Sequence, residues 1–418
     1  MRRAALYICY YNITEPLVQT QVVAYLRELA RSGFEIHLLT FEKERLTRPR
    51  RLSIREKLQR DGIEWYSMQY HSWPSLPATL YDIVRGSVKA LTLCSKHGIP
   101  LVHGRSHVGA AMGWLVKWLR GAKLLFDVRG LLADEYVDAG HWVSGSAKYR
   151  LTKAVEQFLF RNSDALIVLT EALKTDLVRG ELAPIDPAHD VEVIPCCVLV
   201  ERFVREAGRR QAERVRRGWD GRHVLTYVGK LGAWYLVEEM ARFFATARQE
   251  DSRFFLQVLT QSEPEPMRRA LEAVGVPVDA YDIGCLEPAE IPSVLCAADA
   301  GISFRITSRG GLGVSPAKVA EYLAAGLPVI STRGIGDCDA ILARPNLGIT
   351  IDRLAETDYR HATRKLLRLL DDPATPVLCR EFAERELSLG LIGGPRYLSV
   401  YERLCRSVWE DRAKEARV

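Results

Sequence analysis

Hydrophobic and polar positions along the 418 residues follow two periods in turn. Short apolar runs such as residues 4–10 and 34–41 are typical of buried strands in a parallel sheet. Between them, residues 18–32 carry apolar side chains three and four positions apart, which predicts a helix with one buried face that ends at Gly33. This alternation of strand and helix predicts α/β architecture with parallel sheets.

The alternation occurs in two series. The first predicts strands at residues 4–10, 34–41, 63–68, 101–103, 124–128, 165–169 and 191–195. The second predicts strands at residues 224–229, 254–260, 281–284, 299–304 and 328–332, with helices at 236–249, 265–274, 287–297, 316–325, 356–370 and 396–415. We therefore expect two Rossmann-like, doubly wound domains facing across a cleft, residues 1–200 and 201–395, and a C-terminal helix, residues 396–418, packing back on the first.

Composition narrows the class of protein. Hydrophobic residues make up 48% and charged residues 26% of the chain, as in soluble globular proteins, and no apolar run reaches the ~18 residues of a membrane helix. The nine cysteines form no CxxC or Cys/His cluster, which favours a reduced, cytoplasmic protein without a zinc or disulfide framework. The apolar run near the N-terminus is interpreted as a buried strand, because no small-residue cleavage site follows it.

The net charge of +6 is concentrated in two arginine-rich stretches, residues 45–60 and 202–222. They form either solvated helical faces or a surface that attracts anionic lipid or a phosphorylated substrate. Trp73 is expected at the surface, where peripheral contact with the inner face of the membrane is possible, while Trp114 and Trp118 are expected in the core. Aromatic residues do not alternate with the basic ones, so no nucleic-acid partner is expected.

The segment from Gly310 to residue 330 has the features of an anion-binding helix. Ser315 suits the N-cap, Pro316 the first helical position, and Gly326 the end of the helix. The glycine-rich loop before it lets backbone amides approach a ligand, and the helix N-terminus adds partial positive charge. Lys318 and Glu321, three residues apart, form either a surface ion pair or part of a ligand site.

The pattern Ser315-Pro-x-Lys318-x-x-Glu321-Tyr-Leu-Ala-x-Gly-x-Pro-Val-Ile resembles the donor motif of the retaining glycosyltransferases of family four, which have the GT-B fold. The resemblance implies that Glu321 holds the ribose hydroxyls of a nucleotide, a task that suits a carboxylate because it accepts two hydrogen bonds at once. Gly229 and Lys230 resemble the segment that faces the donor diphosphate. His103-Gly-Arg105-Ser and Asp127-Val-Arg129-Gly resemble segments of a bacterial surface-polysaccharide subgroup.

The sequence departs from the family pattern at two positions. Gly313 stands where many members carry a glutamate that touches the donor sugar, so main-chain groups of residues 310–314 are expected to take over. Tyr235 stands where members often place a second basic residue, so neutralisation of the diphosphate is expected to depend on Lys230 with Lys318 or Arg305.

Acceptor-binding residues are expected just after strands of the first domain, at the crevice end of its sheet. Glu15 and Gln19 have an equally good interpretation in helix capping, and His103 is expected to be a packed residue and not a catalyst. The candidate acceptor residues are Asn12, Glu15, Gln19, Arg105, His107, Arg129 and Glu135.

Taken together, the sequence predicts transfer of a sugar from a nucleoside-diphosphate sugar to an acceptor hydroxyl, lipid-linked or in a small glycoside, in polysaccharide, glycolipid or other glycoconjugate synthesis. The resemblance implies retention of configuration; no metal or other cofactor is expected, since Asp337-Cys-Asp339 is interpreted as turn chemistry. Alternatives are a degenerate nucleotide-sugar-binding protein and a sugar-nucleotide epimerase. The candidate catalytic residues are Lys230, Arg129 and Lys318, and the candidate donor-binding residues are Gly229, Lys230, Gly310, Gly311, Gly313, Val314, Ser315, Lys318 and Glu321.

Overall fold

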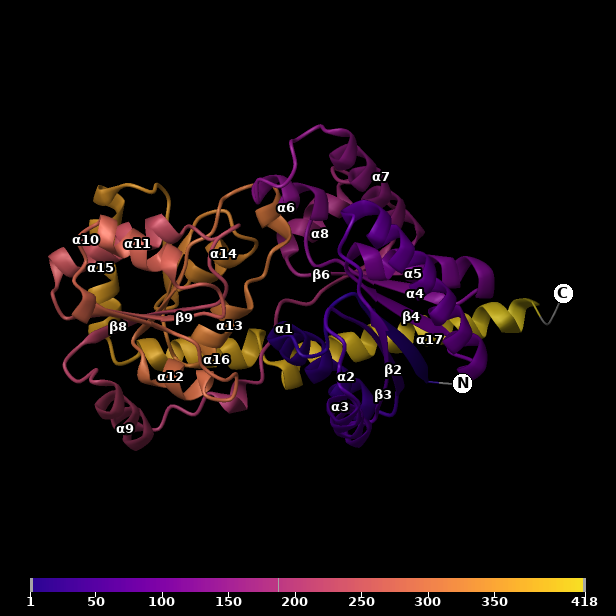
Figure 1. The fold of residues 1–418 in the computed structure, drawn as a ribbon, viewed down its shortest axis with the longest axis horizontal. Helices are drawn as coiled ribbons and strands as arrows, with labels where there is room; N and C mark the ends of the chain where they lie inside the picture. Colours follow the sequence, from indigo (N-terminus) through magenta and orange to yellow (C-terminus); the bar gives the residue numbers. More distant parts are fainter. Residues whose placement is uncertain (1–2, 187, 416–418) are drawn as a thin grey trace. The chain divides into compact units, whose positions relative to one another are not determined.

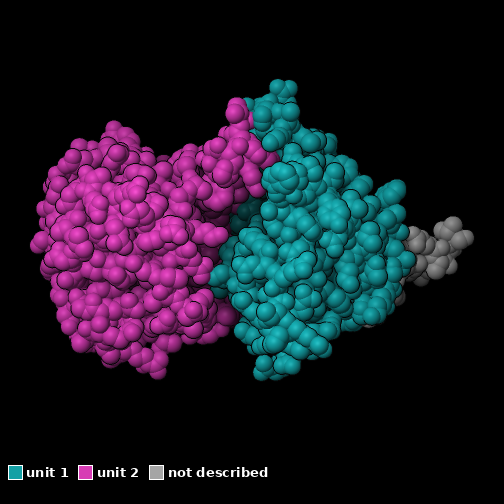
Figure 2. Space-filling model, viewed as in Figure 1, with its two compact units in different colours: residues 1–133, 144–195, 392–418 teal, residues 134–143, 196–391 magenta. Residues whose placement is uncertain are grey.

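The computed structural model describes residues 3–186 and 188–415 and divides into two compact units, coloured separately in Figure 2. The first unit comprises Met1–Ala133, Ser144–Pro195 and Ile392–Val418. The second comprises Asp134–Val143 and Cys196–Leu391. Each unit contains one parallel sheet between helices, which confirms the predicted pair of Rossmann-like domains (Figure 1).

The sheet of the first unit has seven strands in the order β3-β2-β1-β4-β5-β6-β7, and all the pairings are parallel. This order reverses direction between β1 and β4, which makes a crevice at the carboxyl ends of these strands. The strands are β1 (Ala4–Cys9), β2 (Glu35–Glu42), β3 (Ile63–Gln69), β4 (Leu101–Arg105), β5 (Lys123–Asp127), β6 (Ala165–Val168) and β7 (Asp190–Val193).

Helices cover both faces of this sheet because side chains of each strand alternate between its faces. Leu6 and Ile8 of β1 pack against α4 and α5, whereas Tyr7 lies against His103 and the C-terminal helix α17. Figure 1 shows α17 beside α2. The helices of the unit are α1 (Pro16–Val18), the π-helix η1 (Gln19–Val23), α2 (Ala24–Arg31), α3 (Arg48–Arg60), α4 (Ser75–His97), α5 (Ser106–Arg120), α6 (Leu132–Asp138), α7 (Ala147–Asn162), α8 (Glu171–Val178) and α17 (Gly394–Glu415).

The position of α17 agrees with the expectation that the C-terminal helix returns to the first domain. Tyr401 donates to or accepts from Nδ1 of the buried His103 at 2.8 Å, and Arg396 donates to the Val193 carbonyl at 2.7 Å. His103 is therefore a packed residue, as expected. Among the described helices, none is both long and apolar enough to cross a membrane.

The sheet of the second unit has six parallel strands in the order β10-β9-β8-β11-β12-β13. They are β8 (His223–Val228), β9 (Phe254–Leu259), β10 (Tyr281–Gly284), β11 (Ala300–Ser303), β12 (Val329–Thr332) and β13 (Gly348–Ile351). The helices are α9 (Ala207–Arg217), α10 (Val237–Glu250), α11 (Glu265–Ala273), α12 (Ile291–Ala297), α13 (Ala317–Ala324), α14 (Cys338–Leu342), α15 (Glu356–Asp371) and α16 (Thr375–Glu386), with short helices η2 (Val200–Arg202), η3 (Val278–Ala280), η4 (Gly310–Gly313) and η5 (Leu389–Gly393).

Strand β13 and helices α14 and α16 of the second unit were not expected from the sequence. Strand β13 extends the sheet beside β12, although its four residues are too short for a clear period. Helix α16 packs against α13 and has Pro376 in its first turn, and its weak amphipathic pattern hid it. Helix α16 thus contributes to holding the candidate donor helix in place.

Three sequence expectations about surface and core are corrected. Trp118 is 69% exposed, and Trp114, which stacks on it, is only partly buried. The arginine-rich stretch at 202–222 is largely α9, where Arg210 and Arg214 bind Asp299 and nearby carbonyls of the second unit. These two arginines are neither a solvated face nor a lipid-binding surface, because their guanidinium groups are already engaged within the fold.

Candidate donor site and the family of the protein

The carboxyl end of β8 meets the start of α13 in the second unit. Gly229 follows β8 with φ +140°, and a Cβ at this position would lie 3.0 Å from Nζ of Lys318. Tyr322 of α13 fixes the junction, because its hydroxyl accepts from the Val228 amide at 2.9 Å. Glycine at 229 thus satisfies both the backbone conformation and the close approach of a lysine.

Lys318 is a buried lysine whose Nζ forms no ion pair with any residue that the structure describes. The side chain is 7% exposed, and its Nζ has no hydrogen-bond partner among the described residues. Nζ lies 4.0 Å from the ring centroid of Tyr227 and 3.8 Å from that of Tyr235, so two aromatic faces stabilise it. Burial and the nearby charge of Arg305 hold the pKa of Lys318 well below its usual range. A buried cation in this condition is costly unless an anion binds to it.

Glu321 lies one turn further along α13 and is partly buried. Burial raises the pKa of its carboxyl to about 7, against the opposing charges of Arg202 and Lys318. In the part of the chain that the structure describes, its carboxylate forms no ion pair with Lys318 and accepts no side-chain hydrogen bond. The interpretation of the two residues as a surface ion pair is therefore not supported, since Lys318 points instead to Tyr227 and Tyr235.

The glycine-rich loop is a 3-10 turn, η4, that already uses part of its main chain. The amides of Gly311, Leu312 and Val314 donate to carbonyls within the loop, at 3.1 to 3.3 Å. A Cβ on Gly310 would lie 2.4 Å from Oδ2 of Asp138. Glycine at 310 is thus required by a protein contact, and fewer amides remain for a ligand than the sequence suggested.

Residues 134–143 form part of this second unit, which the sequence did not indicate. Ser308 donates to Asp138, and Trp234 Nε1 donates to the Glu135 carbonyl at 2.8 Å. The Glu135 carboxylate lies 3.9 Å from Nη2 of Arg305. Glu135, expected to bind acceptor as part of the first domain, therefore lies on the donor-site unit and pairs with Arg305.

The structure shows the local contacts of two further donor candidates, Ser315 and Lys230. The Ser315 hydroxyl accepts from the Cys196 amide at 3.1 Å and does not cap α13, which begins one residue later than predicted because Pro316 is extended. Lys230 is exposed, and its carbonyl accepts from the Tyr227 hydroxyl. Of the two candidate lysines in this unit, Lys318 is therefore buried and Lys230 is exposed.

In the first unit, a buried charge network occupies the crevice end of the sheet. Asp127 at the end of β5 accepts from Arg105 at 3.2 Å and from Arg129 at 3.4 Å, and the Tyr7 hydroxyl donates to it at 3.4 Å. Burial alone would raise the pKa of Asp127. Interactions with Arg129, His103 and Arg105 outweigh this effect and hold the pKa of Asp127 well below its usual range. Arg105 is 3% exposed, so it orients this network, whereas Arg129 is partly exposed.

The remaining acceptor candidates are engaged within the first unit. His107 Nε2 and the Glu156 carboxylate form a buried pair at 2.9 Å. Gln19, in the π-helix η1, donates to the Ile13 carbonyl at 2.7 Å, and Asn12 accepts from the Thr14 amide. Glu15 occupies the N-cap position of α1 without a side-chain capping bond, and its carboxylate pairs with Lys43 at 3.0 Å. The structure thus assigns local structural contacts to all four.

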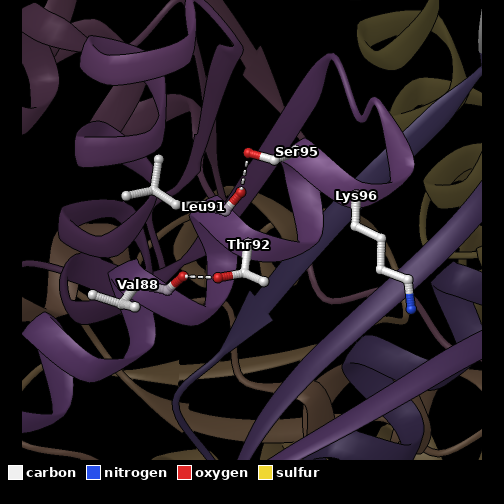
Figure 3. Close-up of a pocket in the computed structure, with 5 residues that line it drawn as sticks. All are labelled: Val88, Leu91, Thr92, Ser95 and Lys96. Atoms are coloured by element: carbon white, nitrogen blue, oxygen red, sulfur yellow. Dashed lines mark hydrogen bonds between the residues drawn. The ribbon is translucent and has the colours of Figure 1, made fainter.

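The group of potential metal ligands and the surface pocket lie in the first unit, and the candidate donor site lies in the second. Asp339 accepts from the Gly334 amide at 3.0 Å, as expected for a turn. Within the described ranges, the one group of three potential metal ligands is Glu35, His37 and His97 in the first unit. A surface pocket of about 600 Å³ lies on α4 and contains no catalytic constellation (Figure 3).

Comparisons with known proteins agree with this arrangement. Residues 18–197 match the family described as the glycosyl transferase 4-like domain. No curated protein sequence matches the chain.

Several solved structures share the fold along nearly the whole chain. Sucrose-phosphate synthase from Thermosynechococcus elongatus is 16% identical, with a TM-score of 0.73 over 97% of this chain and 100% of that one. A glycosyltransferase from Rickettsia africae is 13% identical, with a TM-score of 0.71 over 97% and 99%. HepE from Anabaena, solved with UDP and glucose, is 10% identical, with a TM-score of 0.69 over 98% and 100%.

The family match covers most of the first unit, and the shared fold extends over both sheets. Residues 18–197 therefore match a glycosyl transferase 4-like domain, and the chain as a whole has the two-domain GT-B fold of these glycosyltransferase structures.

Proposed function

We propose that the protein transfers a sugar from a nucleoside-diphosphate sugar to an acceptor hydroxyl. The observation that carries this proposal is the buried, unpaired Lys318 Nζ beside Gly229 and one helical turn from Glu321. A diphosphate supplies the negative charge that Lys318 lacks, and a ribose supplies the hydroxyl donors that Glu321 lacks. HepE, which shares the fold, was solved in complexes with UDP and with UDP-glucose.

Transfer with retention of configuration is the proposed route. The bond between the anomeric carbon and the diphosphate oxygen breaks, and the acceptor oxygen bonds to the same face of the sugar. The acceptor's proton passes to the departing diphosphate. Lys318, with Lys230, neutralises the charge that develops on that leaving group, which is electrostatic stabilisation at the point where it is needed. These cations make transfer without a metal or other cofactor the expected case.

The first unit is proposed to bind the acceptor, lipid-linked or in a small glycoside. Arg129 is the candidate that contacts it, because its guanidinium is partly exposed at the carboxyl end of β5, beside buried Asp127. Arg105 is a positioning residue, since it is buried and bonded to Asp127. We place the reaction in the synthesis of polysaccharide, glycolipid or another glycoconjugate, in the cytoplasm with peripheral contact to the inner face of the membrane.

The proposal is tested by release of free nucleoside diphosphate from a panel of nucleotide sugars, with glycolipid and glycoside acceptors. We expect release from one donor, and the anomeric configuration of the product, read by NMR, to match that of the donor. Binding of nucleotide sugar without release under any acceptor would favour the alternative of a degenerate binding protein. An inverted product would contradict the same-face route.

A further inference from the structure

The outward side of α4 is apolar, which is unusual for a surface helix. Leu76, Leu80, Val84 and Val88 succeed one another at intervals of four and form one row along the helix. These four side chains are between 44 and 63% exposed, and Tyr81 beside them is 54% exposed. An exposed row of this length marks an interaction surface and not a solvated face.

The row continues into the surface pocket near the end of α4. Figure 3 shows the five residues that line this pocket, which are Val88, Leu91, Thr92, Ser95 and Lys96. The hydroxyls of Thr92 and Ser95 donate to the carbonyls of Val88 and Leu91, each at 2.8 Å. Because the hydroxyl protons are used within the helix, the pocket extends the apolar row.

The charged residues around this row are cations. The sequence from residue 65 to residue 126 contains one acidic residue, Asp82. Asp82 is fully buried, where it accepts from the Tyr10 hydroxyl at 2.7 Å and pairs with His71 at 2.6 Å. The cations of α4 are Arg85, Lys89 and Lys96. This helix therefore presents apolar and positive groups to solvent, with no exposed carboxylate.

Helix α5 packs beside α4, and α7 packs beside α5, so the three helices follow one another along this unit. The exposed end of α5 carries Trp118 and Arg120, and the charge of Arg120 reaches Cys94 of α4. Helix α7 exposes Leu151 and Val155, and its acidic residue, Glu156, is buried against His107. We call this surface the α4–α5–α7 face; among the described residues of its three helices, no carboxylate is exposed.

Charge decides which partner fits this face. In a symmetric contact between two copies, the same patch meets itself, so its cations would face one another without an acid. Trp73, just before α4, is 87% exposed, and tryptophan is enriched where membranes meet water. Helix α4, with 23 residues, is about 35 Å long at 1.5 Å per residue, long enough to lie along a bilayer surface.

We propose that the α4–α5–α7 face binds the surface of an anionic lipid bilayer, with the apolar row of α4 lying in the interface. The cations at its ends contact lipid phosphates, and Trp73 and Trp118 lie at headgroup level. This proposal identifies the surface that makes the peripheral membrane contact of the proposed function. It does not depend on whether the protein transfers a sugar.

The test is sedimentation of the full chain with vesicles of phosphatidylcholine, alone or mixed with phosphatidylglycerol. We expect binding to the mixed vesicles only, and weaker binding as salt screens the charges. The double variant Leu80→Glu, Val84→Glu should lose binding at least tenfold. The matched control is Val278→Glu, which changes an exposed apolar residue of the second unit and should leave binding unchanged.

A second pair of variants tests the electrostatic part. Lys96→Gln and Arg120→Gln should each lower vesicle binding about fivefold, as expected for one basic residue near an anionic membrane. The melting temperatures should stay at the wild-type value, because all the substituted side chains are exposed. The proposal would be overturned if the Leu80→Glu, Val84→Glu variant bound the mixed vesicles as tightly as the wild type. It would also be overturned if sedimentation velocity showed a dimer for the wild type that the variant no longer forms. Release of nucleoside diphosphate with a soluble acceptor, measured in parallel, keeps this outcome separate from that of the proposed reaction.

Discussion

Nζ of Lys318 lies 3.8 Å from the ring centroid of Tyr235. In the family that this sequence resembles, the position of Tyr235 is often basic. In the structure, Lys318 reaches from α13 over the tyrosine ring, so a lysine of another element lies at this place. The aromatic face tolerates the buried ammonium group and keeps it available for an anion.

Replacing Lys318 with methionine should separate function from stability. We expect Lys318→Met to lower kcat/KM for sugar transfer by about 100-fold or more, since loss of a charge aimed at the leaving group costs about 2.7 kcal/mol or more of barrier. Thermal unfolding should be unchanged or occur at higher temperature, because an unpaired buried cation is removed. Lys365→Met, at an exposed lysine of α15, is the control and should retain activity. Equal activity of both variants would remove Lys318 from the site.

Glu321 should leave a signature in the pH dependence of stability. Its pKa is raised from 4.5 to about 7, so between these values the folded state holds a proton that the unfolded state has lost. The contribution is present below pH 4.5 and is lost as the pH rises towards 7, at up to about 1.4 kcal/mol per pH unit. Comparison of urea unfolding in wild type and Glu321→Gln should show this difference in slope. Parallel curves for the two proteins would contradict the raised pKa.

Asp127 should be among the most sensitive residues of the first unit. Asp127→Asn leaves the buried Arg105 without its counter-ion, and we expect the free energy of unfolding to fall by about 3–5 kcal/mol. The matched control is Asp61→Asn, which removes a partly exposed pair with Arg27 and should cost no more than about 1 kcal/mol. Denaturant titration of both variants measures the difference. Similar losses of unfolding free energy in the two variants would show that the buried Asp127 pair stabilises the fold no more than the partly exposed Asp61 pair.

Gly310 should control the position of residues 134–143. The Cβ of Gly310→Ala would lie 2.4 Å from Asp138 Oδ2 and 3.2 Å from the Glu135 amide, so this segment must move. We expect faster amide hydrogen exchange in residues 134–143. Gly208→Ala, where a Cβ meets nothing within 4 Å, is the control. If amide exchange in residues 134–143 is unchanged in Gly310→Ala, the glycine-rich loop moves and this segment does not.

Removal of metal ions tests the proposed cofactor independence. We expect a chelator such as EDTA to leave the rate of nucleoside diphosphate release unchanged, because Lys318 and Lys230 supply the positive charge at the leaving group. Addition of Mg²⁺ or Mn²⁺ should likewise have no effect. Restoration of a lost activity by either ion would show that the lysines need a metal beside them.

The order of strands and helices could be predicted because it depends on local periodicity. The candidate donor helix, its glycine-rich loop and the C-terminal helix were found in this way, with boundaries within a few residues. Where the period was short or weak, as in β13 and α16, the prediction missed the element. The start of α13 was misplaced by one residue, since Pro316 suits both an extended and a first helical position.

By itself, the sequence determined the order of strands and helices and predicted the chemistry through its donor motif. Spacing placed Lys318 and Glu321 on one helix and Gly229 after a strand, and the motif resemblance joined them into one site. Only the tertiary structure decided which charges are satisfied. It bound His107 to Glu156, paired Glu135 with Arg305 and buried Asp82. It left Nζ of Lys318 without a hydrogen-bond partner among the described residues, and the apolar row of α4 exposed. The physical reason is that burial and charge pairing depend on tertiary contacts between segments far apart in the sequence. Periodicity along the chain carries no information about those contacts.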